Sequence, residues 1–241
     1  CVVMDKPLTL GILDCDVLHE SLQKQYISYA HMMQTLFRQV APTIHFAIYR
    51  VIDGIYPEDV DECDGYIITG SKSSAYDSDE WIAELRNYLI TLSGQNKKMV
   101  GICFGHQLLA HTLGGAAQKS PNGWGVGVKT ADIIAQPQWM QPNLESYSLL
   151  VSHQDQVVRL PDTATVVAGS EYCPNAAFQI GDHVLGFQGH PEFIRGYSRK
   201  LMEMRRGIIP DDVIEKALES LVEETDHLAV AKWIVNFFNQ P

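Results

Sequence analysis

The chain has 241 residues, 46% of them hydrophobic, and a formal net charge of −11, because 29 acidic residues outnumber 18 basic ones. This length and composition suffice for one substantial hydrophobic core. The acidic balance disfavours binding to nucleic-acid phosphates and to anionic membrane surfaces. No apolar run approaches the ~20 residues that a membrane-spanning helix needs.

The first half of the chain alternates short apolar runs with amphipathic stretches. The apolar runs predict strands at 8–13, 44–51, 65–69 and 99–103. Apolar residues at helical spacing predict helices at 21–40, 81–92 and 104–113. Continuous apolar strands that alternate with helices are typical of a parallel sheet covered on both faces. We therefore expect a doubly wound α/β fold with a mostly parallel central sheet.

The second half of the chain is broken up by Gly, Pro and Asn. Its β-prone pieces lie at 126–134, 148–151, 163–168, 176–180 and 183–187. Short pieces of this kind predict an antiparallel extension of the same sheet. Residues 210–239 return to helical spacing, which fits a helix packed on the core or a face that docks a partner. Since no linker or repeat interrupts the chain, we predict one domain over 1–241, with a C-terminal helical extension at 195–241.

The most informative motif is Gly101-Ile-Cys103-Phe-Gly105, where a predicted strand runs into a predicted helix. Glycines two residues to either side of the cysteine relieve crowding at a sharp turn, the spacing of a nucleophile elbow. The turn would place the thiol beside the first free N–H groups of the helix, which favour thiolate and can stabilise an oxyanion. A cysteine without such a context is more often a buried hydrophobe. That interpretation is kept for the other cysteines, Cys1, Cys15, Cys63 and Cys173.

A thiolate nucleophile needs a general base, and the base needs an acceptor that orients it. Of the nine histidines, His190 stands in Gly-His-Pro-Glu, where extended backbone would point His190 and Glu192 the same way. His106 lies on the helix leaving the elbow, so we expect its side chain to point away from the thiol. The order Cys103, His190, Glu192 differs from the nucleophile, acid, histidine order of α/β-hydrolases, which argues against an esterase.

These two motifs, at 101–107 and 189–193, together resemble the paired signature of class I (triad) glutamine amidotransferases. Within that family the chain is most similar to the glutaminase domain of GMP synthase and its free-standing relatives, over roughly residues 8–193. The resemblance implies a flavodoxin-like fold and a catalytic triad of Cys103, His190 and Glu192. It further implies hydrolysis of the glutamine side-chain amide through a cysteine thioester, giving glutamate and ammonia for a separate acceptor enzyme.

The resemblance also implies an oxyanion hole formed by the backbone N–H groups of Ser71 and Phe104. The Gly-Gly-Pro loop of the family corresponds here to Gly70-Ser71-Lys72. If that loop requires a positive φ at its second residue, Ser71 is strained or the loop is reshaped.

The same resemblance implies substrate contacts at Gly70, Gln107, His153 and Asp155. Gln107 matches the family glutamine that helps to hold the substrate. Residues 152–157 resemble a Ser-His-Gly-Asp-x-Val segment, which implies that His153 and Asp155 lie against the α-amino and α-carboxylate groups of the substrate. A turn after a strand would account for His153 and Asp155 without any such role.

The resemblance implies no cofactor and no metal, and a partner that is glutamine or another γ-glutamyl small molecule. Since no phosphate-binding loop is encoded, ammonia would pass to a separate synthetase subunit. Two alternatives remain open: a γ-glutamyl peptidase or hydrolase with the same triad, and a non-catalytic regulatory homologue. Dispersed cysteines and the lack of a signal-peptide pattern in residues 1–10 favour a cytoplasmic location.

Overall fold

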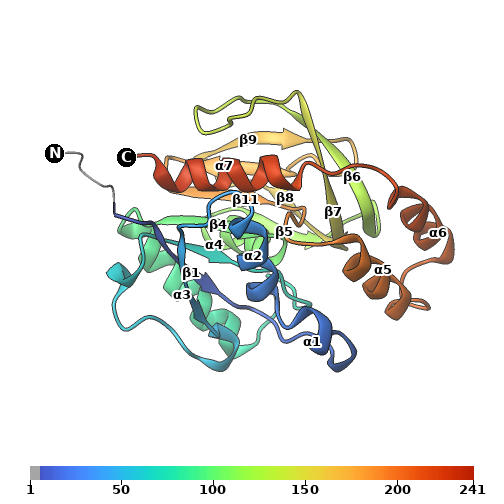
Figure 1. The fold of residues 1–241 in the computed structure, drawn as a ribbon, viewed down its shortest axis with the longest axis horizontal. Coiled ribbons are helices and arrows are strands. Elements are labelled where there is room, and N and C mark those ends of the chain that lie inside the picture. The colour runs from blue at the N-terminus through green and yellow to red at the C-terminus, as the bar shows by residue number, and fades with distance from the viewer. Residues whose placement is uncertain (1–5) are drawn as a thin grey trace.

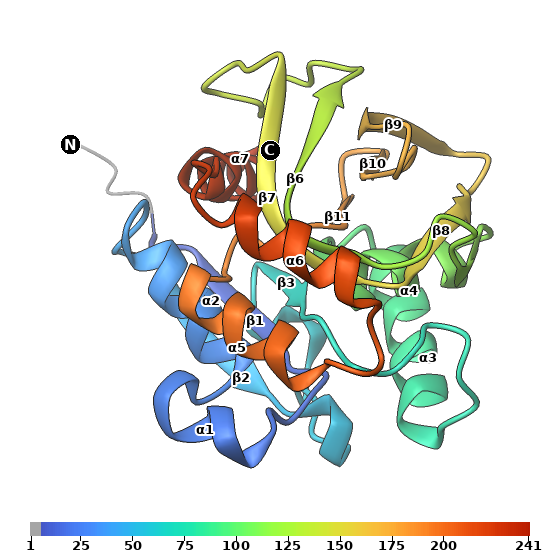
Figure 2. The same cartoon turned by 90° about the vertical axis from the view of Figure 1, so that its right-hand side faces the viewer.

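The structure, a computed structural model, describes residues 6–241. Its centre is a nine-stranded mixed sheet with the order β2-β1-β3-β4-β11-β10-β9-β6-β7 (Figure 1). Helices lie on both sides of this sheet (Figure 2). The doubly wound α/β fold predicted from the sequence is confirmed.

One half of the sheet is parallel. Its strands are β2 (His45–Tyr49), β1 (Thr9–Leu13), β3 (Gly65–Ile68), β4 (Lys98–Ile102) and β11 (Val184–Phe187). Every residue of β3 and β11 is buried. Continuous apolar runs suit these strands because helices cover both faces of a parallel sheet.

The other half of the sheet is antiparallel. It consists of β10 (Ala177–Ile180), β9 (Ala164–Gly169), β6 (Gly125–Ile133) and β7 (Ser146–His153). A separate two-stranded sheet pairs β5 (Ala116–Lys119) with β8 (Asp155–Arg159). The sequence does not predict β5 and β8, because both are short and their outer residues are polar and exposed.

Two helix pairs bury the parallel half. On one face, α2 (Tyr29–Arg38) and α7 (His227–Asn239) pack with β1 and β4 side chains in one core. On the other face, α3 (Glu80–Gly94) and α4 (Phe104–Thr112) form a second core with side chains of β3 and β4. Among residues 6–241, no helix has the length and apolar character needed to cross a bilayer.

The single helix predicted at 21–40 is wrong. The chain forms α1 (Glu20–Tyr26) and α2 instead, separated by Ile27 and Ser28. Ile27 has a φ of 66°, which no α-helix accommodates, and the Ser28 hydroxyl accepts a hydrogen bond from the His31 N–H as the N-cap of α2. Apolar spacing continues through the break, so it conceals the change of direction.

The C-terminal part of the chain is helical but not continuous. Residues 210–239 form α6 (Asp211–Ser220) and α7, and α5 (Arg195–Met204) precedes them. Helices α5 and α6 pack in a third core with side chains of β6 and β7. The end of α5 thereby lies next to the antiparallel half of the sheet.

Candidate active site

Cys103 occupies a strained turn between β4 and α4. Its φ of 54° and ψ of −103° fall where residues with a side chain are rarely found. A Cβ on Gly101 would lie 2.4 Å from the backbone of Gly105, and a Cβ on Gly105 would lie 2.3 Å from the Ile68 carbonyl oxygen. The two flanking glycines are therefore required for the packing of the turn, which accounts for the spacing of the motif.

His190 is fixed on three sides. Its Nδ1 lies 3.2 and 3.1 Å from the two carboxylate oxygens of Glu192, and its backbone N–H donates to the Leu150 carbonyl at 2.8 Å. The Phe193 ring stacks on the imidazole with 3.7 Å between centroids. Because a carboxylate accepts, Nδ1 carries a proton, and Nε2 is the nitrogen left for the Cys103 thiol.

The charges in this cluster reinforce one another. Burial opposes a charge on His190, but Glu192 and the Cys103 thiolate outweigh it and raise the pKa of His190 above its usual value. Burial raises the pKa of three other described thiols and keeps them protonated: Cys15, Cys63 and Cys173.

The loop after β3 packs directly against this cluster. A Cβ on Gly70 would lie 2.9 Å from His190 Cε1. In the described residues a positive φ outside glycine occurs at Ile27, Asn96 and Cys103, so Ser71 carries none of the strain considered from the sequence. The Lys72 N–H donates to the buried carboxylate of Asp16 at 2.9 Å, which holds the loop.

Two backbone N–H groups beside the thiol are free to donate. Within residues 6–241, the N–H groups of Ser71 and Phe104 make no hydrogen bond to the protein. Ser71 follows Gly70 on the loop, and Phe104 is the first residue of α4. Both are groups that could receive an oxyanion.

Gln107 is linked to the Cys103 thiol by hydrogen bonds through Gln188. Its Nε2 donates to the Asp155 carbonyl at 3.0 Å and to Gln188 Oε1 at 3.2 Å, and Gln188 Nε2 donates to Cys103 Sγ at 3.5 Å. The sequence does not single out Gln188. Gln188 and Gly189 form a bend between β11 and His190, so no local spacing indicates this contact.

His153 and Asp155 serve the architecture of the pocket. Burial lowers the pKa of His153 to about 4, so it is neutral near pH 7, and its Nδ1 donates to the Asp155 carbonyl at 2.9 Å. The Asp155 carboxylate accepts hydrogen bonds from Ser74 Oγ at 2.6 Å and from the Tyr76 hydroxyl at 2.8 Å. Asp155 thus ties β8 to the loop that carries Ser71.

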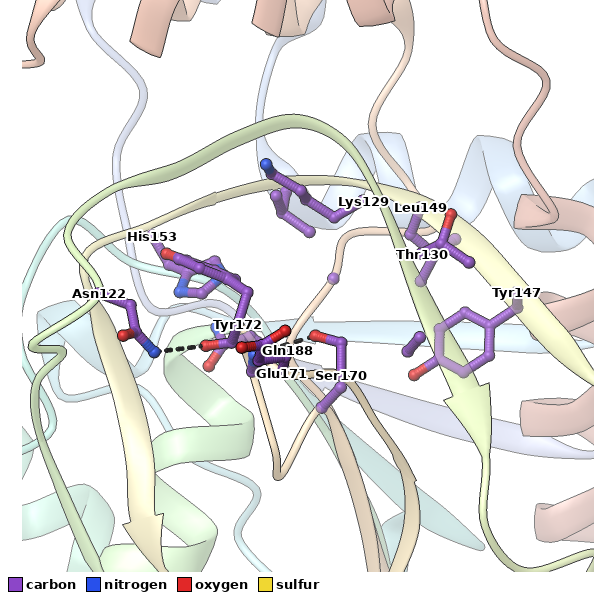
Figure 3. Close-up of a pocket in the computed structure, with 15 residues that line it drawn as sticks. Asn122, Lys129, Thr130, Tyr147, Leu149, His153, Ser170, Glu171, Tyr172 and Gln188 are labelled. Carbon is purple, nitrogen blue, oxygen red and sulfur yellow. Dashed lines mark hydrogen bonds between the residues drawn. The ribbon is translucent and has the colours of Figure 1, made fainter. Parts of the chain in front are cut away.

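Two cavities flank this cluster. A catalytic pocket of about 270 Å³ opens beside Cys103 and is lined by the basic side chains of Lys72, Lys119 and Arg205. A larger cavity of about 550 Å³ lies beyond His153, which lines both. Figure 3 shows Tyr147 and Tyr172 on opposite sides of the larger cavity. Among residues 6–241, no group of three or more His, Cys, Asp or Glu is placed to hold a metal.

The chain is similar to several known proteins. Residues 24–206 match the family described as glutamine amidotransferase class-I. Gamma-glutamyl peptidase 2 of Arabidopsis thaliana is 33% identical over 181 residues, which cover 72% of this chain and 73% of that protein. GMP synthase [glutamine-hydrolyzing] of Porphyromonas gingivalis is 32% identical over 182 residues, covering 69% of this chain but 34% of that protein.

Solved structures share the fold. A glutamine amidotransferase from Thermotoga maritima superposes with a TM-score of 0.73 at 19% identity, covering 96% of this chain and 98% of that one. At that level of identity the likeness concerns the fold. Together with the match over residues 24–206, these findings show that the chain belongs to the class I glutamine amidotransferase family.

Proposed function

We propose that this chain hydrolyses the amide at the γ-carbonyl of a glutamyl group, with glutamine as the simplest substrate. The observation that carries the proposal is the position of Cys103, on a strained elbow, beside a histidine that is held by Glu192 and made more basic. A cysteine with a neighbouring base and an orienting acceptor is the arrangement that nucleophilic catalysis requires. The family membership gives the same reaction class.

In the proposed mechanism, the Cys103 thiolate attacks the γ-carbonyl carbon. The N–H groups of Ser71 and Phe104 stabilise the oxyanion, and the loss of one such donor costs roughly 3–4 kcal/mol of transition-state stabilisation. The C–N bond breaks as His190 protonates the leaving amine, which leaves a γ-glutamyl thioester. A water molecule then gives a proton to His190 and cleaves the thioester, while Glu192 orients the imidazole.

With glutamine the products are glutamate and ammonia. We infer that a separate acceptor enzyme uses the ammonia. A cytoplasmic location is part of the same proposal, and it is supported by the unpaired thiols of the described cysteines, Cys15, Cys63, Cys103 and Cys173.

A second candidate is the cleavage of γ-glutamyl peptides. It is favoured by the gamma-glutamyl peptidases of Arabidopsis thaliana among the relatives, and by the basic residues around the catalytic pocket. Both reactions share the thioester and differ in the leaving group. A peptide leaves as an amine that still carries a carboxylate, whereas glutamine releases neutral or protonated ammonia.

A glutamate-release assay on the purified chain tests the proposal. We expect release from glutamine or from γ-glutamyl dipeptides, and complete loss in Cys103→Ala with the fold retained. Cys173→Ala is the matched control, because burial keeps that thiol protonated. Absence of release from every γ-glutamyl compound, or full activity in Cys103→Ala, would contradict the proposed chemistry.

A further inference from the structure

A third cavity, here called the side hollow, adjoins the catalytic pocket. This side hollow has a volume of about 270 Å³ and lies between α1, α2 and α5. Its wall is largely apolar and includes Leu18, Leu22, Tyr29, Tyr197, Leu201 and Met204. Lys72 and Arg205 line both the side hollow and the catalytic pocket, so two cations stand where the two spaces meet.

Arg205 is held in place at this junction. Its Nη1 donates to Ser152 Oγ at 2.7 Å, and its guanidinium lies over the Trp124 ring, 5.5 Å from the centroid. The Ser152 carbonyl is in turn 3.8 Å from Cys103 Sγ. Ser152 thus links Arg205 to the thiol, and none of the ion pairs in the described part of the chain includes Arg205.

The carboxylate that lines the side hollow offsets these cations only in part. Asp16 also lines the side hollow, but its carboxylate accepts the backbone N–H groups of Val17 at 2.8 Å and Lys72 at 2.9 Å. The Lys72 ammonium is 3.7 Å from it and mostly exposed. The remaining N–H groups of the Arg205 guanidinium are free, although the chain as a whole carries a net charge of −11. The guanidinium is therefore suited to bind a carboxylate from a ligand.

The position of His190 indicates which part of the substrate meets these cations. Tyr29 lines the side hollow, and its ring lies against His190 with 6.2 Å between centroids. In the proposed mechanism, His190 protonates the leaving amine. The leaving amine therefore lies toward Tyr29 and the side hollow.

We propose that the side hollow is a leaving-group site, in which Arg205, assisted by Lys72, binds the carboxylate of the departing amino acid. This inference rests on the proposed γ-glutamyl chemistry. In an α-amino acid one carbon separates the amine from the carboxylate, so the anchor must lie close to the thiol, as Arg205 does. The apolar wall takes the side chain. The substrate class is a γ-glutamyl amide of an apolar α-amino acid, and hydrolysis of its γ-carbonyl C–N bond by one water yields glutamate and the free amino acid.

Steady-state kinetics on γ-glutamyl-leucine, γ-glutamyl-leucinamide and glutamine test this assignment. We expect Arg205→Ala to lower kcat/KM for γ-glutamyl-leucine roughly 10- to 100-fold, mainly through KM, because a charge-assisted hydrogen bond is lost. The leucinamide and glutamine lack the leaving-group carboxylate, so their kcat/KM should change by less than about 3-fold. For the unmodified chain, γ-glutamyl-leucine should be a better substrate than γ-glutamyl-glycine, because glycine leaves the hollow empty.

Arg206→Ala is the matched control. Arg206 is the neighbouring arginine, it pairs with Glu203 and Glu215, and it lines neither space. Ser152→Ala distinguishes a binding role of Arg205 from a structural one. The variant loses the hydrogen bond that positions Arg205 but keeps the guanidinium. It should therefore retain most of the discrimination between γ-glutamyl-leucine and the leucinamide.

Three outcomes would overturn the assignment. Equal losses on all three substrates in Arg205→Ala would place Arg205 on the α-carboxylate of the glutamyl group. Unchanged kinetics in Arg205→Ala would show that Arg205 does not bind the substrate. A fall in kcat at constant KM would show that the role of Arg205 is structural. Failure of the proposed function looks different, because the unmodified chain would then cleave none of the three compounds.

Discussion

The two halves of the sheet contribute to the site in different ways. In the proposed mechanism the parallel half supplies the nucleophile and the base: Cys103 directly follows β4, and His190 lies three residues after β11. Gly70, which packs against His190, lies two residues after β3. All three lie at carboxyl ends of neighbouring parallel strands, where open α/β sheets commonly form their sites. The antiparallel half and α5 supply Ser152, His153 and Arg205 around the pocket.

The halves also differ in what holds these residues. Around Cys103 the constraint is backbone against backbone, since a single added Cβ would collide with a neighbouring strand or turn. Around Arg205 the constraint is one side-chain hydrogen bond and one ring contact. Changes in the parallel half should therefore abolish chemistry or folding, whereas changes in the antiparallel half should alter substrate preference.

The largest effect is expected at the nucleophile. Cys103→Ser should lower kcat by roughly 10⁴-fold or more, because the proposed reaction has no other nucleophile. Burst kinetics and mass spectrometry of a trapped γ-glutamyl enzyme are the measurements. A covalent adduct on Cys15 or Cys63 would break the assignment of chemistry to the end of β4.

A loss of folding is expected at the elbow glycines. Gly101→Ala should lower the free energy of unfolding by about 3 kcal/mol or more, because its Cβ would lie 2.4 Å from the Gly105 backbone. Urea denaturation measures this. Gly94→Ala is the control in the same half: nothing lies within 4 Å of its Cβ, and an alanine in α3 should stabilise by about 0.5–1 kcal/mol. Similar values for the two variants would refute a backbone constraint.

A smaller effect, confined to activity, is expected at Gly70. In Gly70→Ala the new Cβ would meet His190 Cε1 at 2.9 Å and displace the imidazole from the thiol. We expect kcat to fall roughly 10- to 100-fold, since misplacement of a general base on this scale is costly. The melting temperature should change little. A proportionate loss of stability would show that the loop supports the fold rather than the base.

The last expected effect is a pH dependence of stability, to which both halves contribute and which is absent near neutral pH. Burial lowers the pKa of His106 on α4 to about 3 and that of His153 at the end of β7 to about 4. In the unfolded chain each histidine takes up a proton as the pH falls below 6.5, whereas in the folded chain it stays neutral down to its lowered pKa. The stability contributed by the neutral, buried histidines is therefore fully present above pH 6.5. That contribution is lost as the pH falls toward the folded pKa, at about 1.4 kcal/mol per pH unit for each group.

Denaturation at several pH values tests this expectation. His153→Asn should flatten the acid slope by about one proton, and His106→Asn should do the same if the fold tolerates the amide. An unchanged slope in both variants would mean that other groups set the acid lability.

Some structural features cannot be seen in the sequence. Gln188 and Arg205 reach the catalytic pocket through side-chain contacts that span 85 and 53 positions of the chain. No local spacing indicates such contacts. The break at Ile27 and Ser28 was concealed for a related reason, because apolar periodicity reports burial and not a change of helix direction.

The sequence by itself determined the α/β class and identified Cys103, His190 and Glu192 as candidates. It could do so because glycines flanking a turn and a histidine two residues before an acidic residue are local patterns. In the structure Pro191 and Glu192 form a turn and not the extended backbone that the sequence suggested, but the turn also brings Glu192 to the imidazole. Tertiary structure alone decided that these candidates meet. Strand β11 pairs in parallel with β4, which brings His190 beside Cys103, and α5 folds back so that Arg205 lies beside Ser152. Strand order and helix packing depend on long-range burial, which no single segment encodes.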